Sequence, residues 1–202
     1  ALEDLDAAAL GPGLTTHPET VKLVHRLVRE GRLPLVVDAD GLNAIAEDLS
    51  TLKDRRDSPL VLTPPPGEFA RLIDASVPEV LEEQLHHVRS FCREYNVWLI
   101  LKTFRPLIGT PKGHLFVSPR GNPGMATAGM GDVLTGVVLS LLGRFASEGR
   151  TDPDDFTRAV SLAVYLHGMA GDFAAEENGQ ESLIAGDLID YLGDAYEELL
   201  DP

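Results

Sequence analysis

Short apolar segments alternate with helical patterns along most of this chain, and this alternation limits the possible folds more than any other feature. Strands that alternate with helices form a mostly parallel sheet, with helices covering both of its faces. The expected strands are "DAAAL" (6–10), "PLVVDAD" (34–40), "PLVLT" (59–63) and "VWLILK" (97–102), followed by a β-hairpin formed by "PLIG" (106–109) and "HLFV" (114–117). The sequence therefore predicts an α/β fold with a doubly wound, mostly parallel sheet in one domain over residues 1–202.

The helix after the first strand has the clearest boundaries. Thr16 as N-cap, with Glu19 three residues later, matches a capping box, and Gly31 is the expected C-cap. Short helices are expected after the strands at 34–40 and 59–63. Longer helices are expected at 78–95, from near Asp132 onward, at 154–177 and at 184–199.

The composition argues against several classes of function. The formal net charge of -15 on 202 residues argues against nucleic acid as a partner, because phosphate contacts need a basic surface. No apolar run in the sequence approaches the length of a membrane span, so no membrane contact is expected. The single cysteine, Cys92, excludes an internal disulfide framework and fits a reducing cytoplasm. We therefore expect a cytoplasmic protein whose anionic ligands bind at one local site.

The stretch "GNPGMATAGMGDVLTG" (121–136) places four glycines just before an apolar helix. If the helix begins near Asp132, the N–H groups of residues 129–132 are its unpaired first-turn donors and face whatever lies in front of them. The helix dipole and the absence of Cβ atoms at the glycines suit this site to a phosphate. A carboxylate at the same place suits a base that takes a proton from a hydroxyl attacking that phosphate. The alternative is that Asp132 only caps the helix.

Four loops follow the four parallel strands, each with Gly, Pro or a charged residue. Ligands of such sheets bind at the carboxyl ends of the strands, so these loops are expected to line one pocket. Asp38 and Asp40, at the end of the second strand, could orient a Mg²⁺-bound water or cap the next helix. The loops are "GPGLT" (11–15), "DADGLN" (38–43), "TPPPGE" (63–68) and "LKTFRP" (101–106).

Several of these segments resemble one family. They resemble, in order, the ADP- or ATP-dependent NAD(P)H-hydrate dehydratases of the ribokinase-like superfamily. Besides the loops and the glycine stretch, the matching blocks are "AVYLHGMAGDFAAEE" (163–177) and "LIAGDLIDYL" (183–192). The resemblance implies a ribokinase-like fold and repair of hydrated NADH or NADPH. The ring hydroxyl is phosphorylated by ADP or ATP, with Mg²⁺ expected, and loss of phosphate restores the reduced cofactor.

The resemblance also implies roles for single residues. Asp132 is expected to be the catalytic base that contacts the substrate hydroxyl, and no residue is assigned as a metal ligand. The sequence pattern itself, rather than the resemblance, places His167 on an apolar helix face, where it is expected to be a core histidine rather than a base, and Gly168 and Gly171 in the same helix are expected to permit close helix packing. The implied nucleotide-binding residues are Lys102, Thr103, Arg105, Gly129 and Gly131, and the implied substrate-binding residues are Gly13, Asn122 and Asp132.

The chain departs from the family pattern in places. Pro65 stands where the family usually has a histidine that touches the substrate, Thr15 replaces a common glycine, and "TFRP" follows "LK" in place of a glycine. We also expect the domain to lack an N-terminal strand-and-helix segment, which would leave an uncovered sheet edge and favour a homo-oligomer. Two alternatives stay open: a small-molecule kinase of the same superfamily, and a non-catalytic nucleotide-binding relative.

Overall fold

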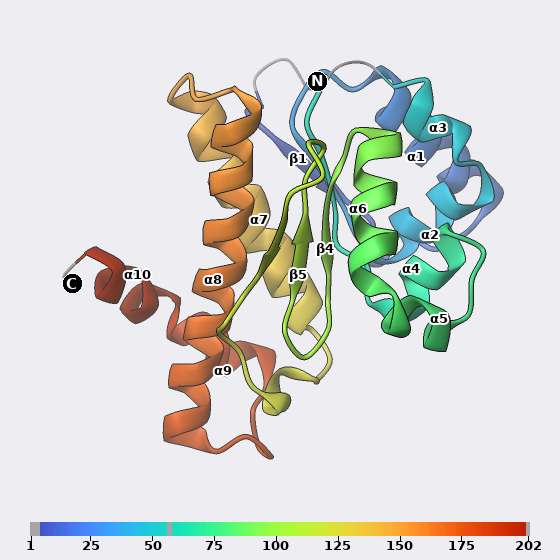
Figure 1. The fold of residues 1–202 in the computed structure, drawn as a ribbon. Helices are drawn as coiled ribbons and strands as arrows, with labels where there is room; N and C mark the ends of the chain where they lie inside the picture. Colours follow the sequence, from blue (N-terminus) through green and yellow to red (C-terminus); the bar gives the residue numbers. More distant parts are fainter. Residues whose placement is uncertain (1–4, 56–57, 201–202) are drawn as a thin grey trace.

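A computed structural model describes residues 5–55 and 58–200 of the chain (Figure 1). Its centre is a six-stranded sheet with the strands in chain order. The first four strands are parallel, and the last two form the antiparallel hairpin that the sequence predicts. The strands are β1 (Ala8–Leu10), β2 (Leu35–Val37), β3 (Leu60–Leu62), β4 (Trp98–Leu101), β5 (Leu107–Gly109) and β6 (Leu115–Val117).

Helices cover both faces of the sheet, as predicted (Figure 1). The helices that connect the parallel strands lie on one face: α1 (Pro18–Glu30), α2 (Ala39–Glu47), α3 (Ser50–Lys53), α4 (Pro66–Leu72), α5 (Val77–Glu82) and α6 (Gln84–Tyr95). The other face is covered by helices that come after the hairpin: α7 (Met130–Ser147) and α8 (Pro153–Asn178), with α9 (Ala185–Asp190) and α10 (Leu192–Leu200) packed against α8.

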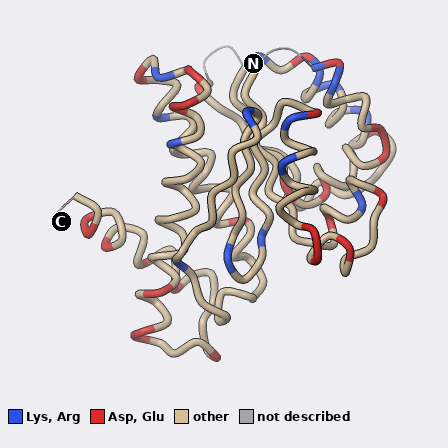
Figure 2. The backbone as a smooth tube through the Cα atoms, viewed as in Figure 1, with Lys and Arg blue, Asp and Glu red and all other residues tan. Residues whose placement is uncertain are grey.

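Alternate residues of each strand enter two separate hydrophobic cores. In β4, Trp98 and Ile100 join the core under α7 and α8, whereas Leu99 and Leu101 join the core under α1 to α6. Side chains that point alternately to opposite faces explain why these strands are apolar throughout. Figure 2 shows the charged residues mostly on the helices and loops around the sheet, with acidic residues on both sides of it.

Several element boundaries differ from the sequence prediction. The N-cap of α1 is His17, whose Nδ1 accepts the N–H of Glu19 at 3.3 Å, so the assignment of Thr16 was wrong. Pro18 explains the difference, because proline favours the first helical position and puts the cap on the residue before it. The segments 78–95 and 184–199 each form two helices, which meet at Glu83 and Tyr191.

Helix α7 begins at Met130, two residues before the predicted start at Asp132. Gly129 precedes it with a φ of 87°, a left-handed conformation that glycine adopts at little cost. By length and composition α7 could cross a membrane, so the statement that no apolar run approaches that length was wrong for this segment. However, α7 packs against α8 and the sheet and buries seven of its residues, as expected for a core helix.

Candidate active site at the start of α7

The glycine stretch lies at the carboxyl ends of the parallel strands and leads into α7. The N–H groups of Gly131 and Asp132 have no hydrogen-bond acceptor among the described residues. They belong to the first turn of an 18-residue helix, where the helix dipole favours negative charge. Of the four donors that the sequence predicts for an anion site at 129–132, those of Gly129, Gly131 and Asp132 are free within the described structure, and that of Met130 donates to the carbonyl of Thr127 at 3.5 Å.

Asp132 occupies the third helical position of α7 and is exposed. Because Gly129 is the N-cap, the alternative that Asp132 caps the helix is wrong. Its carboxylate has no hydrogen-bond or ion-pair partner within the described part of the chain. An exposed carboxylate without a partner, next to free N–H donors, is available to accept a proton from a bound hydroxyl.

Lys102, directly after β4, brings a positive charge to the same place. A Cβ atom added at Gly131 would lie 3.0 Å from the Nζ atom of Lys102, so the ammonium lies against the first turn of α7. The ammonium also donates to Oδ1 of Asp38 at 2.8 Å. The free N–H groups and the ammonium together form a positive site suited to the phosphates of a nucleotide.

Asp38 does not cap α2, and its role in orienting a Mg²⁺-bound water stays a prediction. It occupies the N-cap position of α2, but its side chain makes no capping bond. The carboxylate is buried, and its second oxygen accepts the hydroxyl of Thr135 at 2.9 Å. Its two oxygens thus accept hydrogen bonds from Lys102, directly after β4, and from Thr135 in α7.

Asp40 fixes the loop after β1. Its carboxylate accepts the N–H of Thr15 at 2.8 Å and the side-chain amide of Asn43 at 3.3 Å. Thr15 has a φ of 65°, a left-handed conformation that is unfavourable for a β-branched residue. Gly13 has a φ of 71°, and no heavy atom lies within 4 Å of the Cβ position there. The loop thus leaves open space at Gly13, where a substrate was expected.

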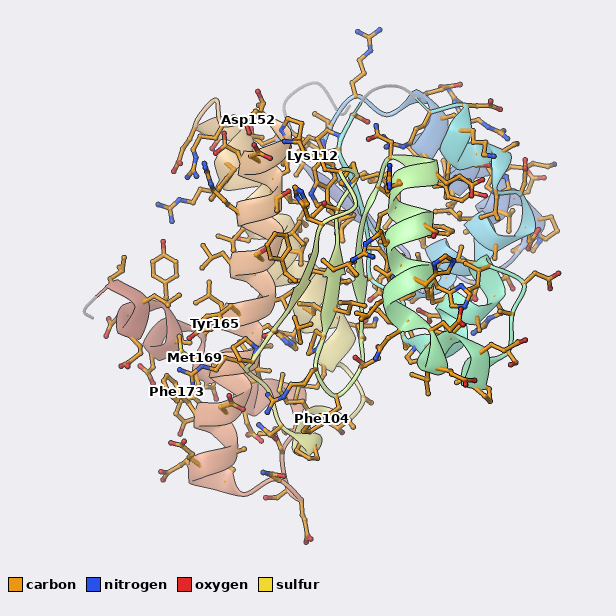
Figure 3. All side chains as sticks on the ribbon, viewed as in Figure 1. Phe104, Lys112, Asp152, Tyr165, Met169 and Phe173 are labelled. Carbon is orange, nitrogen blue, oxygen red and sulfur yellow. The ribbon has the colours of Figure 1, made fainter. Side chains whose placement is uncertain are left out.

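A cavity of about 530 Å³ lies between the end of β4, the glycine stretch, α7 and α8. Phe104, which is 64% exposed, belongs to the lining and lies toward the lower part of Figure 3, whereas Lys112 and the α8 N-cap Asp152 lie toward its upper part. Lining residues that the sequence predicted are Lys102, Thr103, Asn122 and Gly131, and residues that it missed include Phe104, Arg120 and Leu134.

Two of the predicted binding residues, Arg105 and Asn122, hold the glycine stretch in place, and a third, Thr103, bonds to Arg105. Arg105 donates to the carbonyl groups of Pro119 and Gly121, and Thr103 donates to the carbonyl of Arg105. Asn122 donates to the carbonyl of Gly171 and to a carboxylate oxygen on α8, and its own side-chain oxygen accepts a loop N–H. Their polar groups are thus engaged with the protein, and a direct contact with a ligand stays a prediction.

His167 forms part of the cavity wall and is a satisfied core histidine, as expected. Its Nε2 donates to the carbonyl of Met130 at 3.1 Å, and burial lowers its pKa from 6.5 to about 4. A Cβ at Gly168 would lie 2.9 Å from the backbone carbon of Arg120, and one at Gly171 would lie 2.4 Å from Sδ of Met125. These two glycines therefore allow the glycine stretch to pack directly on α8.

Glu68 lies close enough to the site for its carboxyl to interact electrostatically with Lys102 and Asp38, and the sequence patterns did not indicate it. Its Oε2 is buried without a hydrogen-bond partner in the described structure. Burial raises the pKa of this carboxyl above its ordinary value, although the nearby Lys102 ammonium opposes the shift. The loop "TPPPGE" was expected to line the pocket, and within it the family pattern singles out the position of Pro65 rather than that of Glu68.

With this geometry in view, comparison with known proteins identifies the family. Residues 1–193 match the family described as NAD(P)H-hydrate dehydratase. The chain belongs to this family.

Two relatives extend the comparison. The chain is 45% identical over 191 residues to a bifunctional NAD(P)H-hydrate repair enzyme of Moorella thermoacetica, covering 95% of this chain and 34% of that protein. The chain thus spans about a third of the length of such curated relatives. It also superposes on the ADP/ATP-dependent NAD(P)H-hydrate dehydratase of Bacillus subtilis co-crystallized with ATP/Mg²⁺, with a TM-score of 0.80, 31% identity and coverage of 96% of this chain and 64% of that one.

The predicted fold is confirmed as well. A ribokinase-like superfamily protein of Enterococcus faecalis matches 95% of this chain and 63% of its own, with a TM-score of 0.75 and 23% identity. At that identity the likeness bears on the fold alone. The mostly parallel α/β sheet is therefore ribokinase-like.

Proposed function

We propose that this protein dehydrates hydrated NADH and NADPH with ADP or ATP as the phosphate donor. The observation that carries the proposal is the partner-free carboxylate of Asp132, located beside the free N–H groups of α7 and the ammonium of Lys102. Passive binding of a phosphate would gain nothing from a carboxylate at this place. Transfer of the phosphoryl group to a hydroxyl requires a proton acceptor there.

The proposed reaction has two steps. The hydroxyl oxygen of the hydrated ring attacks the terminal phosphorus of the nucleotide, and the bond to the bridging oxygen breaks, while Asp132 takes the hydroxyl proton. Lys102 and the N–H groups of Gly131 and Asp132 stabilise the charge on the transferred phosphoryl group. The phosphoester then loses inorganic phosphate, and loss of a ring proton restores the double bond of the reduced nicotinamide.

The donor set at this site fits a Mg²⁺ ion that accompanies the nucleotide. Mg²⁺ at nucleotide sites is usually held by one or two carboxylates together with phosphate oxygens and water, so a cluster of protein ligands is not needed. Glu68, with its buried partner-free oxygen, is the side chain suited to this role. When bound, the ion supplies positive charge to the phosphate chain.

The remaining roles carry over as part of the same proposal. Thr103, Arg105 and Gly129 would contribute to the nucleotide side of the site, and Gly13 and Asn122 to the hydrated dinucleotide. Pro65 cannot donate a side-chain hydrogen bond, so the contact that the family's usual histidine makes would come from elsewhere.

We also propose a cytoplasmic homo-oligomer. The buried, unpaired Cys92 supports a reducing compartment. A groove of about 750 Å³ along the β1 edge supports association, because apolar residues such as Leu23 and Leu27 line it. The oligomeric state can be measured by light scattering at several protein concentrations, and a monodisperse monomer throughout would contradict the proposal.

Product analysis separates the dehydratase from a small-molecule kinase. Incubation with hydrated NADPH and ATP should release one inorganic phosphate for each reduced cofactor recovered, without a stable phosphoester. Accumulation of a phosphoester would support the kinase, and unchanged nucleotide with measurable nucleotide binding would support the non-catalytic relative.

A further inference from the structure

Two buried hydrogen bonds in series connect α7 to Lys102. Thr135, which is 4% exposed, donates its hydroxyl to Oδ2 of Asp38 at 2.9 Å, and Oδ1 of Asp38 accepts the Lys102 ammonium at 2.8 Å. The Asp38 side chain is 2% exposed, and the Lys102 side chain is 22% exposed. These two hydrogen bonds therefore join a rigid helix to the cation at the candidate nucleotide site through one buried carboxylate.

The backbone of Asp38 is fixed as firmly as its side chain. Its N–H donates to the carbonyl of Leu10 in the neighbouring strand at 3.1 Å, and its carbonyl accepts the N–H of Gly41 at 2.9 Å. With both carboxylate oxygens also occupied, neither the position nor the rotation of the carboxylate is free. Asp38 is thus a fixed anchor at the end of β2.

Lys102 needs such an anchor. A lysine ammonium ends a flexible four-carbon stem and can point in many directions, unlike the planar group of arginine. Asp38 restricts it to a position 3.0 Å from the Cβ site of Gly131, beside the free N–H donors. Without the anchor, the ammonium would adopt this position only part of the time.

We propose that Asp38 and Thr135 are positioning residues that hold the Lys102 ammonium against the first turn of α7, ready for the phosphates of the nucleotide. The inference rests on the proposed function, because that function places the phosphates at Lys102. Thr135 lies outside the lining of the cavity, so it would act only through Asp38.

The first test is Thr135→Val, which keeps the shape and every charge of the site. Loss of a hydrogen bond to a charged group should weaken the binding of ADP and ATP about three- to tenfold in titration calorimetry. The matched control is Thr51→Val, because Thr51 is fully buried in α3 at the other end of the sheet and its hydroxyl has no hydrogen-bond partner in the described structure (Figure 1). This control should bind both nucleotides like the wild type.

The second test asks whether Thr135 acts through Lys102. In a Lys102→Met background, Thr135→Val should cause no further loss of nucleotide affinity, whereas a general structural effect of Thr135 would cause the same loss in both backgrounds. If thermal melting shows that Lys102→Met is unfolded because Asp38 is left unpaired, the Asp38→Asn and Lys102→Met double variant serves as the background. Unchanged affinity in Thr135→Val, or an equal loss in both backgrounds, would overturn the inference.

These affinities also separate the inference from the proposed function. If the wild-type protein binds nucleotide but does not convert hydrated NADH to NADH, the proposed function is contradicted. The affinity comparison would still decide the role of Thr135. Wild-type protein that binds no nucleotide would contradict both.

Discussion

Replacement of Gly131 by alanine tests the nucleotide site with a single methyl group. The added Cβ would lie 3.0 Å from Nζ of Lys102 and 3.6 Å from Oδ2 of Asp38. It would therefore occupy the space between the first turn of α7 and the ammonium, where the account places a phosphate. The nearest contact is with the far end of a flexible side chain, so the protein can accommodate the methyl group by a small movement of Lys102.

The two expected effects have opposite signs. Alanine is more favourable than glycine within a helix by about 0.5–1 kcal/mol, which offsets the small cost of moving Lys102. A phosphate displaced by the methyl group would lose at least one hydrogen bond with a charged partner, a loss of about 1.5–3 kcal/mol. Affinity for ADP and ATP should therefore fall by roughly tenfold or more while the free energy of unfolding stays constant or rises slightly.

Titration calorimetry with both nucleotides, together with urea unfolding, measures the two effects separately. Gly136→Ala is the matched control, because Gly136 lies in the same helix and has no heavy atom within 4 Å of its Cβ position. The control should gain stability and keep its nucleotide affinity. Gly131→Ala with the nucleotide affinity of the wild type would refute the placement of the phosphates at α7.

Three further predictions concern other residues. Asp132→Asn should lower turnover by about 10²–10⁴-fold while nucleotide affinity stays within a few-fold, and near-wild-type turnover would end its assignment as the base. The pKa of His167 is lowered from 6.5 to about 4, so the unfolded chain binds a proton in that range that the native chain does not. Stability should therefore fall by up to about 3 kcal/mol as pH drops from 6.5 to 4, and urea unfolding of His167→Gln should lack this part of the fall. Thr15→Asn should raise the melting temperature slightly, because asparagine tolerates the left-handed conformation of Thr15 better, and a lower melting temperature would contradict this account.

Most of the fold could be predicted from the sequence because its signals are local. Apolar strands and the hairpin each depend on neighbouring residues, and all six strands lie where the patterns place them. The division of 78–95 into two helices could not be predicted, because it depends on the conformation of Glu83, whose φ of −118° interrupts an otherwise continuous helical pattern.

The candidate site likewise contains residues that could be predicted from the sequence and residues that could not. The predictions for Gly131 and Asp132 rest on a helix start that can be recognised in the sequence, and the prediction for Lys102 rests on the family resemblance. The pair of Asp38 and Lys102 could not, since the two residues are 64 positions apart and meet only when β2 and β4 take their places in one sheet. The partner-free oxygen of Glu68 also depends on packing, because burial alone decides whether water reaches it.

The proposed activity restores reduced nicotinamide from its hydrate at the expense of a nucleotide. The most direct measurement mixes purified protein, hydrated NADH and Mg²⁺ with ADP or ATP, and follows the near-ultraviolet absorbance that belongs to the reduced nicotinamide ring but not to its hydrate. The account predicts that this absorbance rises only when nucleotide is present, with release of inorganic phosphate, and that Asp132→Asn abolishes the rise. No rise with the folded, nucleotide-binding wild-type protein, for either nucleotide, would contradict it.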